Sequence, residues 1–99
     1  MKISTFQTQV YNLCKKIPKG KVTTYKEIAK TMNTKACRAV GTSLNKNPFK
    51  EVPCHRVINS NGNIGRFARG TNKKIKILKK ERIKIKKNKI DLKEYLFKF

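Results

Sequence analysis

The sequence predicts a mainly α-helical domain with a short extended segment in its middle. The chain has 99 residues, of which 37% are hydrophobic, and this size and composition suit one folded domain. Capping patterns at residues 4–7 and 24–27 each precede apolar residues at helical spacing. Turn signals at residues 47–48 and 59–63 enclose a segment without that spacing. We therefore expect a single domain over residues 1–99.

The first helix is expected to begin after Ser4 and to stop at Pro18. Its apolar face is formed by Phe6, Val10, Leu13 and Ile17. The turn that follows contains Gly20, which is typical of a break between two helices.

A pair of short helices follows this turn. Thr24 caps the first of them, Asn33 breaks it, and Thr34 can cap the next, which runs to about Asn45. Two short helices joined by a tight turn form a helix-turn-helix. The predicted fold class is therefore a mainly α, winged-helix-like helix-turn-helix domain, in which residues 49–58 form a short β wing or extended segment.

The second helix of this pair is rich in small side chains, namely Ala36, Ala39, Gly41 and Ser43. Small side chains allow a helix backbone to approach another surface closely. That surface is either a DNA groove or simply a neighbouring helix of the same domain.

The last third of the chain carries two more helix signals. Thr71 can cap a helix that reaches Glu81, and Asp91 opens an apolar pattern that extends to Phe99 and indicates a small helix docked on the body. Residues 84–99 are expected to form a basic tail with this helix at its end. Residues 82–89 fit a short strand and a frayed helix end equally well.

The charge of the chain points to a polyanionic partner. Twenty-six Lys and Arg residues against five Asp and Glu give a formal charge of +21. Nucleic acid is the first candidate and an acidic membrane surface a distant second. A lysine-rich compositional bias explains part of the excess equally well.

The cysteines and the absence of long apolar runs indicate a soluble, cytoplasmic protein. Cys14, Cys37 and Cys54 are odd in number and lack CxxC spacing, which argues for reduced thiols and against a zinc site. No apolar run approaches the roughly 20 residues of a membrane span. We expect neither a metal nor a membrane partner.

The segment around Cys54 carries the candidate chemistry. A cysteine nucleophile needs a base, and His55 is the only histidine of the chain. Glu81 could fold back to orient the imidazole, and Glu51 is a nearer but less certain alternative. Adjacent side chains on a strand point to opposite faces, so a bridging water or a bend at Pro53 would be needed. Taken alone, such a pair is more often a structural cysteine beside a satisfied histidine.

The segment Pro53-Cys54-His55-Arg56-Val57 resembles the active-site signature of the O6-alkylguanine-DNA alkyltransferases. Residues 19–29 resemble the family's entry to its helix-turn-helix, and Cys37-Arg38-Ala39-Val40-Gly41 resembles its Ala-Arg-Ala-Val-Gly recognition helix. The resemblance covers roughly residues 4–83, with five separated motifs in order.

This resemblance implies binding to double-stranded DNA that contains O6-alkylguanine. The helix-turn-helix would enter the minor groove, unlike most such motifs, and the small residues Ala36, Ala39 and Gly41 would permit the close approach. Arg38 matches the finger that replaces the damaged base in the stack, and Tyr25 matches the residue that drives the nucleotide out. The protein would act as a monomer near the nucleoid, and cooperative binding on DNA stays open.

The resemblance also implies a single-turnover transfer of the alkyl group to Cys54, with no cofactor. His55 would take the thiol proton through a water, with Glu81 holding the imidazole, and Tyr25 would give a proton to the guanine. Lys74 matches a lysine that helps to acidify the cysteine.

A second set of residues matches family positions that shape the substrate pocket. Asn47 matches a side chain that braces the turn beneath the site, and Val57 matches a backbone contact to the base. The residues expected to shape the substrate pocket are Asn47, Pro53, Val57, Phe67 and Ala68.

The chain departs from the family pattern at several positions. Phe67 and Ala68 stand where the family has Tyr and Ser, and Arg69 and Arg82 each replace a glycine. The N-terminal ribonuclease-like domain of many relatives is missing, and we expect a complete protein in which the helix from Asp91 covers part of the surface that such a domain would protect.

Two other functions fit parts of the pattern. A non-catalytic alkyltransferase-like protein, which recognises the lesion and recruits other repair factors, would commonly carry Trp at the position of Cys54. A generic winged-helix transcription factor would not need the Pro-Cys-His-Arg motif.

Overall fold

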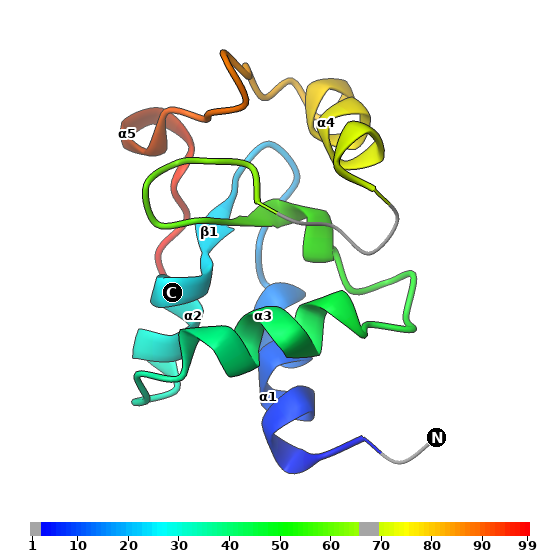
Figure 1. Cartoon of the computed structure of the whole chain (residues 1–99), viewed down its shortest axis with the longest axis vertical. Coiled ribbons are helices and arrows are strands. Elements are labelled where there is room, and N and C mark those ends of the chain that lie inside the picture. Colours follow the sequence, from blue (N-terminus) through cyan, green and yellow to red (C-terminus); the bar gives the residue numbers. More distant parts are fainter. Residues whose placement is uncertain (1–2, 66–69) are drawn as a thin grey trace.

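The computed structural model describes residues 3–65 and 70–99 and confirms the mainly α-helical fold (Figure 1). The helices are α1 (Thr5–Cys14), α2 (Tyr25–Thr31), α3 (Cys37–Asn45), the 3-10 helix η1 (Cys54–Arg56), α4 (Thr71–Lys80) and α5 (Leu92–Tyr95), and the strands are β1 (Thr23–Thr24) and β2 (Val57–Ile58). Helices α2 and α3 form the predicted helix-turn-helix pair and pack against α1.

A small parallel sheet lies at the centre of the molecule. Strand β1 pairs with β2, and Thr23 lies opposite Val57. The C-terminal segment adds to the other side of β1, because Val22 donates its N–H to Tyr95 O (2.9 Å) and accepts from Phe97 N (2.7 Å). Strand β1 leads directly into Tyr25, so this sheet fixes where the helix-turn-helix begins.

The sheet separates two hydrophobic clusters. Val57 belongs to a cluster formed with α1, α2 and α3, whereas its neighbour Ile58 belongs to a cluster formed with α4 and the C-terminal segment. Successive side chains of a strand point to opposite faces. The two residues of β2 therefore connect the helix-turn-helix half of the molecule to the α4 half.

The first two helix starts agree with the sequence, and two later ones do not. Ser4 forms a complete capping box with Gln7, and Thr24 accepts a hydrogen bond from Glu27 N. Thr34 was wrongly predicted as a cap: its hydroxyl bonds the N–H of Ala36 in a turn, and α3 begins only at Cys37.

The prediction for Thr71 was also wrong. It is the first residue of α4 and Gly70 is the capping position, without a side-chain hydrogen bond.

Helix α4 ends as predicted next to Glu81, through a left-handed residue. Arg82 has φ 66°, and Ile83 N donates to Leu78 O at 3.1 Å while Arg82 N donates to Lys79 O at 3.0 Å. These two hydrogen bonds define a Schellman motif, which usually has glycine at this position. The arginine thus adopts the conformation expected of the glycine that it replaces.

Three expectations for extended or helical segments need correction. Residues 82–89 are neither strand nor frayed helix but a loop with isolated bridges, and residues 49–58 contain the 3-10 helix η1 rather than a continuous extended run. The last helix stops at Tyr95, because the backbone of Leu96 and Phe97 turns to pair beside Val22. In residues 3–65 and 70–99, no helix is long and apolar enough to cross a membrane.

Candidate active site

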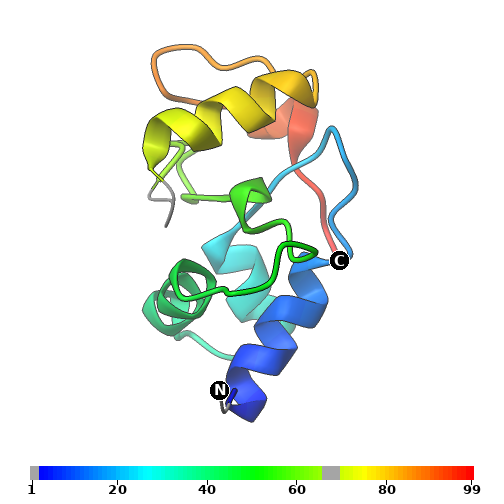
Figure 2. The same cartoon turned by 90° about the vertical axis from the view of Figure 1, so that its right-hand side faces the viewer.

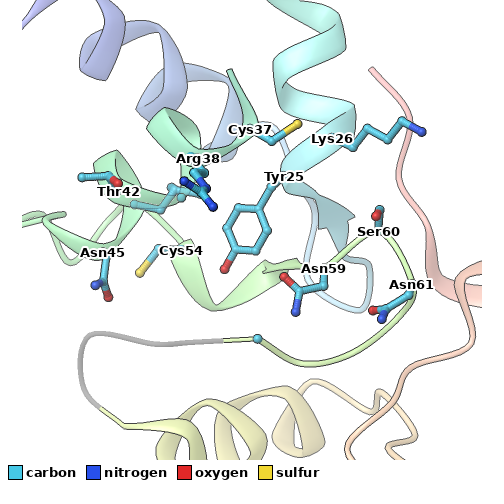
Figure 3. Close-up of a pocket in the computed structure, with 13 residues that line it drawn as sticks. Tyr25, Lys26, Cys37, Arg38, Thr42, Asn45, Cys54, Asn59, Ser60 and Asn61 are labelled. Atoms are coloured by element: carbon cyan, nitrogen blue, oxygen red, sulfur yellow. The ribbon is translucent and has the colours of Figure 1, made fainter. Parts of the chain in front are cut away.

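Cys54 lies in a pocket between the helix-turn-helix and the loop after β2 (Figure 3). The pocket has a volume of about 630 Å³. Its lining residues come from α2, α3, η1 and the loop, and they are Tyr25, Lys26, Cys37, Arg38, Gly41, Thr42, Leu44, Asn45, Cys54, Asn59, Ser60, Asn61 and Gly65. A thiol thus lies in the same cavity as a phenol and a guanidinium, next to α3.

The turn that presents Cys54 is held from below by one amide side chain. Asn47 Nδ2 donates to Phe49 O (3.0 Å) and to Val52 O (3.1 Å), and its Oδ1 accepts from Phe49 N (2.9 Å). Three hydrogen bonds from a single side chain fix a segment that has no regular structure. The 3-10 turn after Pro53 then carries Cys54 and His55 out of a strand geometry.

The side chain of His55, next to Cys54 in the sequence, contacts the carboxylate of Glu81. His55 Nε2 lies 3.0 Å from Glu81 Oε2, and both side chains are largely buried, at 15% and 8% exposure. An ionised carboxylate only accepts hydrogen bonds, so the neutral imidazole carries its proton on Nε2. The Nδ1 lone pair is then the base of this ring.

Arg56 binds the same carboxylate from a second direction. Its Nε donates to Glu81 Oε1 at 2.9 Å, its Nη2 donates to Glu81 Oε2 at 2.7 Å, and its Nη1 donates to Ile17 O at 2.8 Å. This two-pronged pairing fixes the carboxylate plane. Arg56 lies in the same motif as Cys54 and His55. Its contact with Glu81 was not predicted, because nothing in the sequence indicated a partner for its side chain.

The environment favours the neutral form of His55 and the ionised form of Glu81. Burial lowers the pKa of His55 below its ordinary value, although the hydrogen bond to Glu81 works in the other direction. Burial alone would raise the pKa of Glu81, but the hydrogen bonds from Arg56 and His55 outweigh it and the pKa is lowered. At neutral pH the site therefore holds a neutral imidazole beside an ionised carboxylate.

Lys74 is a fully buried cation on the inner face of α4. Its Nζ donates to Val57 O at 2.8 Å. Burial lowers its pKa to about 8, and the nearby Cys54 and Cys14 work against this shift. The ammonium thus ties the inner face of α4 to the backbone of β2.

Tyr25 faces the cavity at the first position of α2 (Figure 3). Burial raises its pKa to about 12, and Cys54 and Cys14 add to the shift. Its ring lies against α3 at Gly41, where an added Cβ would lie 3.8 Å from the ring carbon Cδ1. The phenol therefore stays protonated at neutral pH and can donate a hydrogen bond into the pocket.

The structure distributes the predicted site residues between the pocket lining and several places outside it. Cys54, Tyr25, Arg38 and Gly41 line the pocket; His55, Glu81 and Lys74 lie outside its lining, grouped by the contacts given above. Ala36 and Ala39 are exposed on α3 or at its start, without lining the pocket. Asn47, Pro53 and Val57 do not line it either and belong to the supporting turn and strand. Phe67 and Ala68 lie outside the described residues.

Several lining residues were not identified from the sequence as parts of a site. Asn59, Ser60 and Asn61 form one wall, where the sequence indicated only a turn. Cys37 lines the same pocket from α3 (Figure 3). Polar turn residues directly after the Cys54 segment were the available signal.

The helix-turn-helix fold and the cysteine-containing pocket agree with one family of DNA-binding domains, and the sequence comparison establishes that family. Residues 5–83 match the family described as "6-O-methylguanine DNA methyltransferase, DNA binding domain", and the chain belongs to it.

Relatives with curated names include a "Methylated-DNA--protein-cysteine methyltransferase" of Methanosarcina acetivorans, 50% identical over 78 residues, which cover 77% of this chain and 50% of the relative. A protein of the same name from Sulfolobus acidocaldarius is 45% identical over 84 residues, covering 84% of this chain and 53% of that protein. The chain thus spans about half the length of these relatives.

Solved structures of two kinds are similar to this chain. Schizosaccharomyces pombe Atl1 in complex with damaged DNA containing O6-carboxymethylguanine superposes with a TM-score of 0.88 at 35% identity, with 100% of both chains covered. Mycobacterium tuberculosis OGT in complex with DNA gives a TM-score of 0.78 at 36% identity, covering 82% of this chain and 52% of that one.

Proposed function

We propose that this protein repairs DNA by direct reversal, transferring the alkyl group of O6-alkylguanine irreversibly to Cys54. The observation that carries the proposal is a thiol in a pocket shared with Tyr25 and Arg38, next in sequence to a His55–Glu81 pair at 3.0 Å. The partner is double-stranded DNA containing the lesion; in support, the similar Atl1 structure holds damaged DNA and the similar OGT structure holds DNA. Free thiols at all three cysteines suit action in the reducing cytoplasm.

The reaction is a displacement at the alkyl carbon. His55 takes the proton of Cys54 through a water, and the thiolate sulfur attacks the carbon bound to O6. The carbon–oxygen bond breaks, its electron pair stays on the guanine, and a proton delivered from Tyr25 neutralises the base. The proton taken up by His55 is returned through water to the Tyr25 phenolate, so the overall step is neutral. A thioether forms on Cys54. Nothing in this sequence of steps returns the thiol, so each molecule reacts once.

Access to the base requires that the nucleotide leaves the helix. Arg38 is exposed on α3 and lines the pocket, so its guanidinium can fill the space in the base stack. Extrusion costs a few kcal/mol, and less where alkylation has already weakened the base pair. This difference provides part of the selectivity for damaged guanine.

A second function is favoured by one observation. Atl1 of S. pombe matches this chain over the whole length of both. On this alternative the chain would bind the lesion without chemistry. Cys54 in the pocket supports alkyl transfer over this alternative, because a module that only binds the lesion needs no thiol there.

Mass spectrometry of the intact protein separates these functions. After incubation with a duplex containing O6-methylguanine, we expect the protein to gain one methyl group, located on the peptide with Cys54. Cys54→Ala should gain none while still binding the damaged duplex. Unmodified wild-type protein that binds the lesion tightly would instead support the binding module.

A further inference from the structure

One side of the molecule is basic and lies apart from the pocket. It consists of the outer face of α4 and the loop that follows, and we name it the α4 surface. Its exposed cations are Lys73, Lys76, Lys79, Lys80, Arg82, Lys84, Lys86, Lys87 and Lys89. Residues 71–90 contain one acidic side chain, Glu81, which is buried and already bound by Arg56 and His55. No carboxylate of residues 71–90 therefore neutralises these nine cations, and the surface can bind an external anion.

The loop part of the α4 surface is ordered by backbone hydrogen bonds. Lys86 and Lys89 exchange two of them, each 2.9 Å long, across a two-residue turn. Lys87 and Asn88 have φ values of 51° and 61°, as a type I′ turn requires. On the inner side, Ile83 and Ile90 are buried in the second hydrophobic cluster. The lysines thus project from a fixed backbone rather than from a loose tail.

The α4 surface does not overlap the pocket. None of its nine cations belongs to the pocket lining, which comes from α2, α3, η1 and the loop at 59–65. Both views show α4 and the following loop together at the end of the molecule away from the N-terminus, with α3 nearer its middle (Figures 1 and 2). DNA held at α3 would therefore leave cations on the α4 surface free for other contacts.

We propose that the α4 surface binds the phosphate backbone of a second DNA duplex segment, so that one protein molecule bridges two segments. Lysine ammonium groups attract phosphates as point charges without reading the sequence. Each phosphate contact releases counterions, so several together give appreciable, salt-sensitive binding. The inference rests on the proposed function in one respect: that function places the first duplex at the pocket that contains Cys54.

A capture assay tests bridging directly. One duplex is fixed to beads and a second, fluorescent duplex is added with the protein at limiting concentration. We expect protein-dependent capture of the fluorescent duplex. The triple variant K80Q/K84Q/K86Q should reduce capture about tenfold or more near physiological salt, since each phosphate contact contributes separately. It avoids the left-handed positions, so the turn is preserved.

The matched control is K15Q/K16Q/K19Q, which removes the same charge from exposed lysines near the end of α1. It should capture within about twofold of wild type, and both variants should keep alkyl transfer to Cys54. A second variant, K73Q/K76Q/K79Q, repeats the test on α4 alone. The inference is overturned by wild type that does not bridge, by equal loss in test and control variants, or by bridging that requires two protein molecules. Loss of alkyl transfer with bridging intact would count only against the proposed function.

Discussion

His55 Nε2 lies 3.0 Å from Glu81 Oε2, and the same carboxylate is bound by Arg56, so the imidazole is oriented by an ionised carboxylate whose charge is paired with a guanidinium. These contacts join η1 to the end of α4. Arg56 and Glu81 are 25 positions apart in the sequence. The hydrogen bond to Glu81 fixes the tautomer of the neutral imidazole, with the proton on Nε2. Nδ1 is therefore free to accept a proton only while Glu81 holds Nε2 in this way.

The pH dependence of alkyl transfer should show this arrangement. Because burial lowers the pKa of His55, the acidic limb of the rate profile should lie below pH ~6.5, the ordinary histidine value. Glu81→Gln removes a group that raises the pKa of His55, so the limb should move to still lower pH while the plateau rate falls. His55→Ala should slow transfer about 100-fold or more. A limb that moves to higher pH in Glu81→Gln would contradict this account.

Lys74 should make stability depend on pH in the alkaline range. The pKa of Lys74 is about 8 in the folded chain and the ordinary lysine value is 10.5, so between these values the unfolded chain binds a proton that the folded chain does not. Wild type should therefore gain stability relative to Lys74→Met as pH rises from 8 to 10.5, by at most about 1.4 kcal/mol per pH unit. Urea denaturation of both proteins at several pH values measures the difference. Parallel curves would show that the buried ammonium does not titrate in this window.

Arg38 should matter for duplex DNA and not for an isolated base. Arg38→Ala should slow transfer from a duplex about tenfold or more, because base extrusion loses its replacement in the stack. Transfer from free O6-alkylguanine base should change less than about threefold. Lys35→Ala, which removes an exposed charge just before α3, is the control. Equal losses on duplex and free base would assign Arg38 to the chemistry instead.

The C-terminal segment should stabilise the body of the protein. Truncation after Asn88 removes Ile90 and Tyr95 from the second cluster, together with the pairing of Phe97 beside Val22. We expect the melting temperature to fall by about 10 °C or more, since 1 kcal/mol corresponds to roughly 4–8 °C in a domain of this size. Deleting only Lys98 and Phe99, both exposed, is the control. An unchanged melting temperature after the longer truncation would contradict this role.

Local signals in the sequence were enough for much of the fold. Ser4 and Thr24 act as predicted because a cap depends on residues three positions away. The end of the tail could not be predicted in the same way. Leu96 leaves the helix to pair beside Val22, a contact between distant parts of the chain, and the helical spacing of Asp91 to Phe99 gave no sign of it.

In the candidate site, too, some contacts could be predicted from the sequence and others depend on tertiary packing. The contact of Glu81 with His55 agrees with the expectation from the motif, although the catalytic roles remain predictions. The 3-10 turn at Cys54 and the pairing of Arg56 with Glu81 depend on how α4 packs against η1. Packing of this kind is a tertiary property that spacing along the chain does not report.

The central claim is that Cys54 accepts one alkyl group and does not release it. The most direct test is the number of methyl groups per protein molecule after prolonged incubation with excess O6-methylguanine duplex, measured by mass spectrometry with peptide mapping. The account predicts a plateau at one methyl per molecule, on Cys54, with Cys14 and Cys37 unmodified. No methyl on Cys54, or DNA repaired in excess of the protein present, would contradict it.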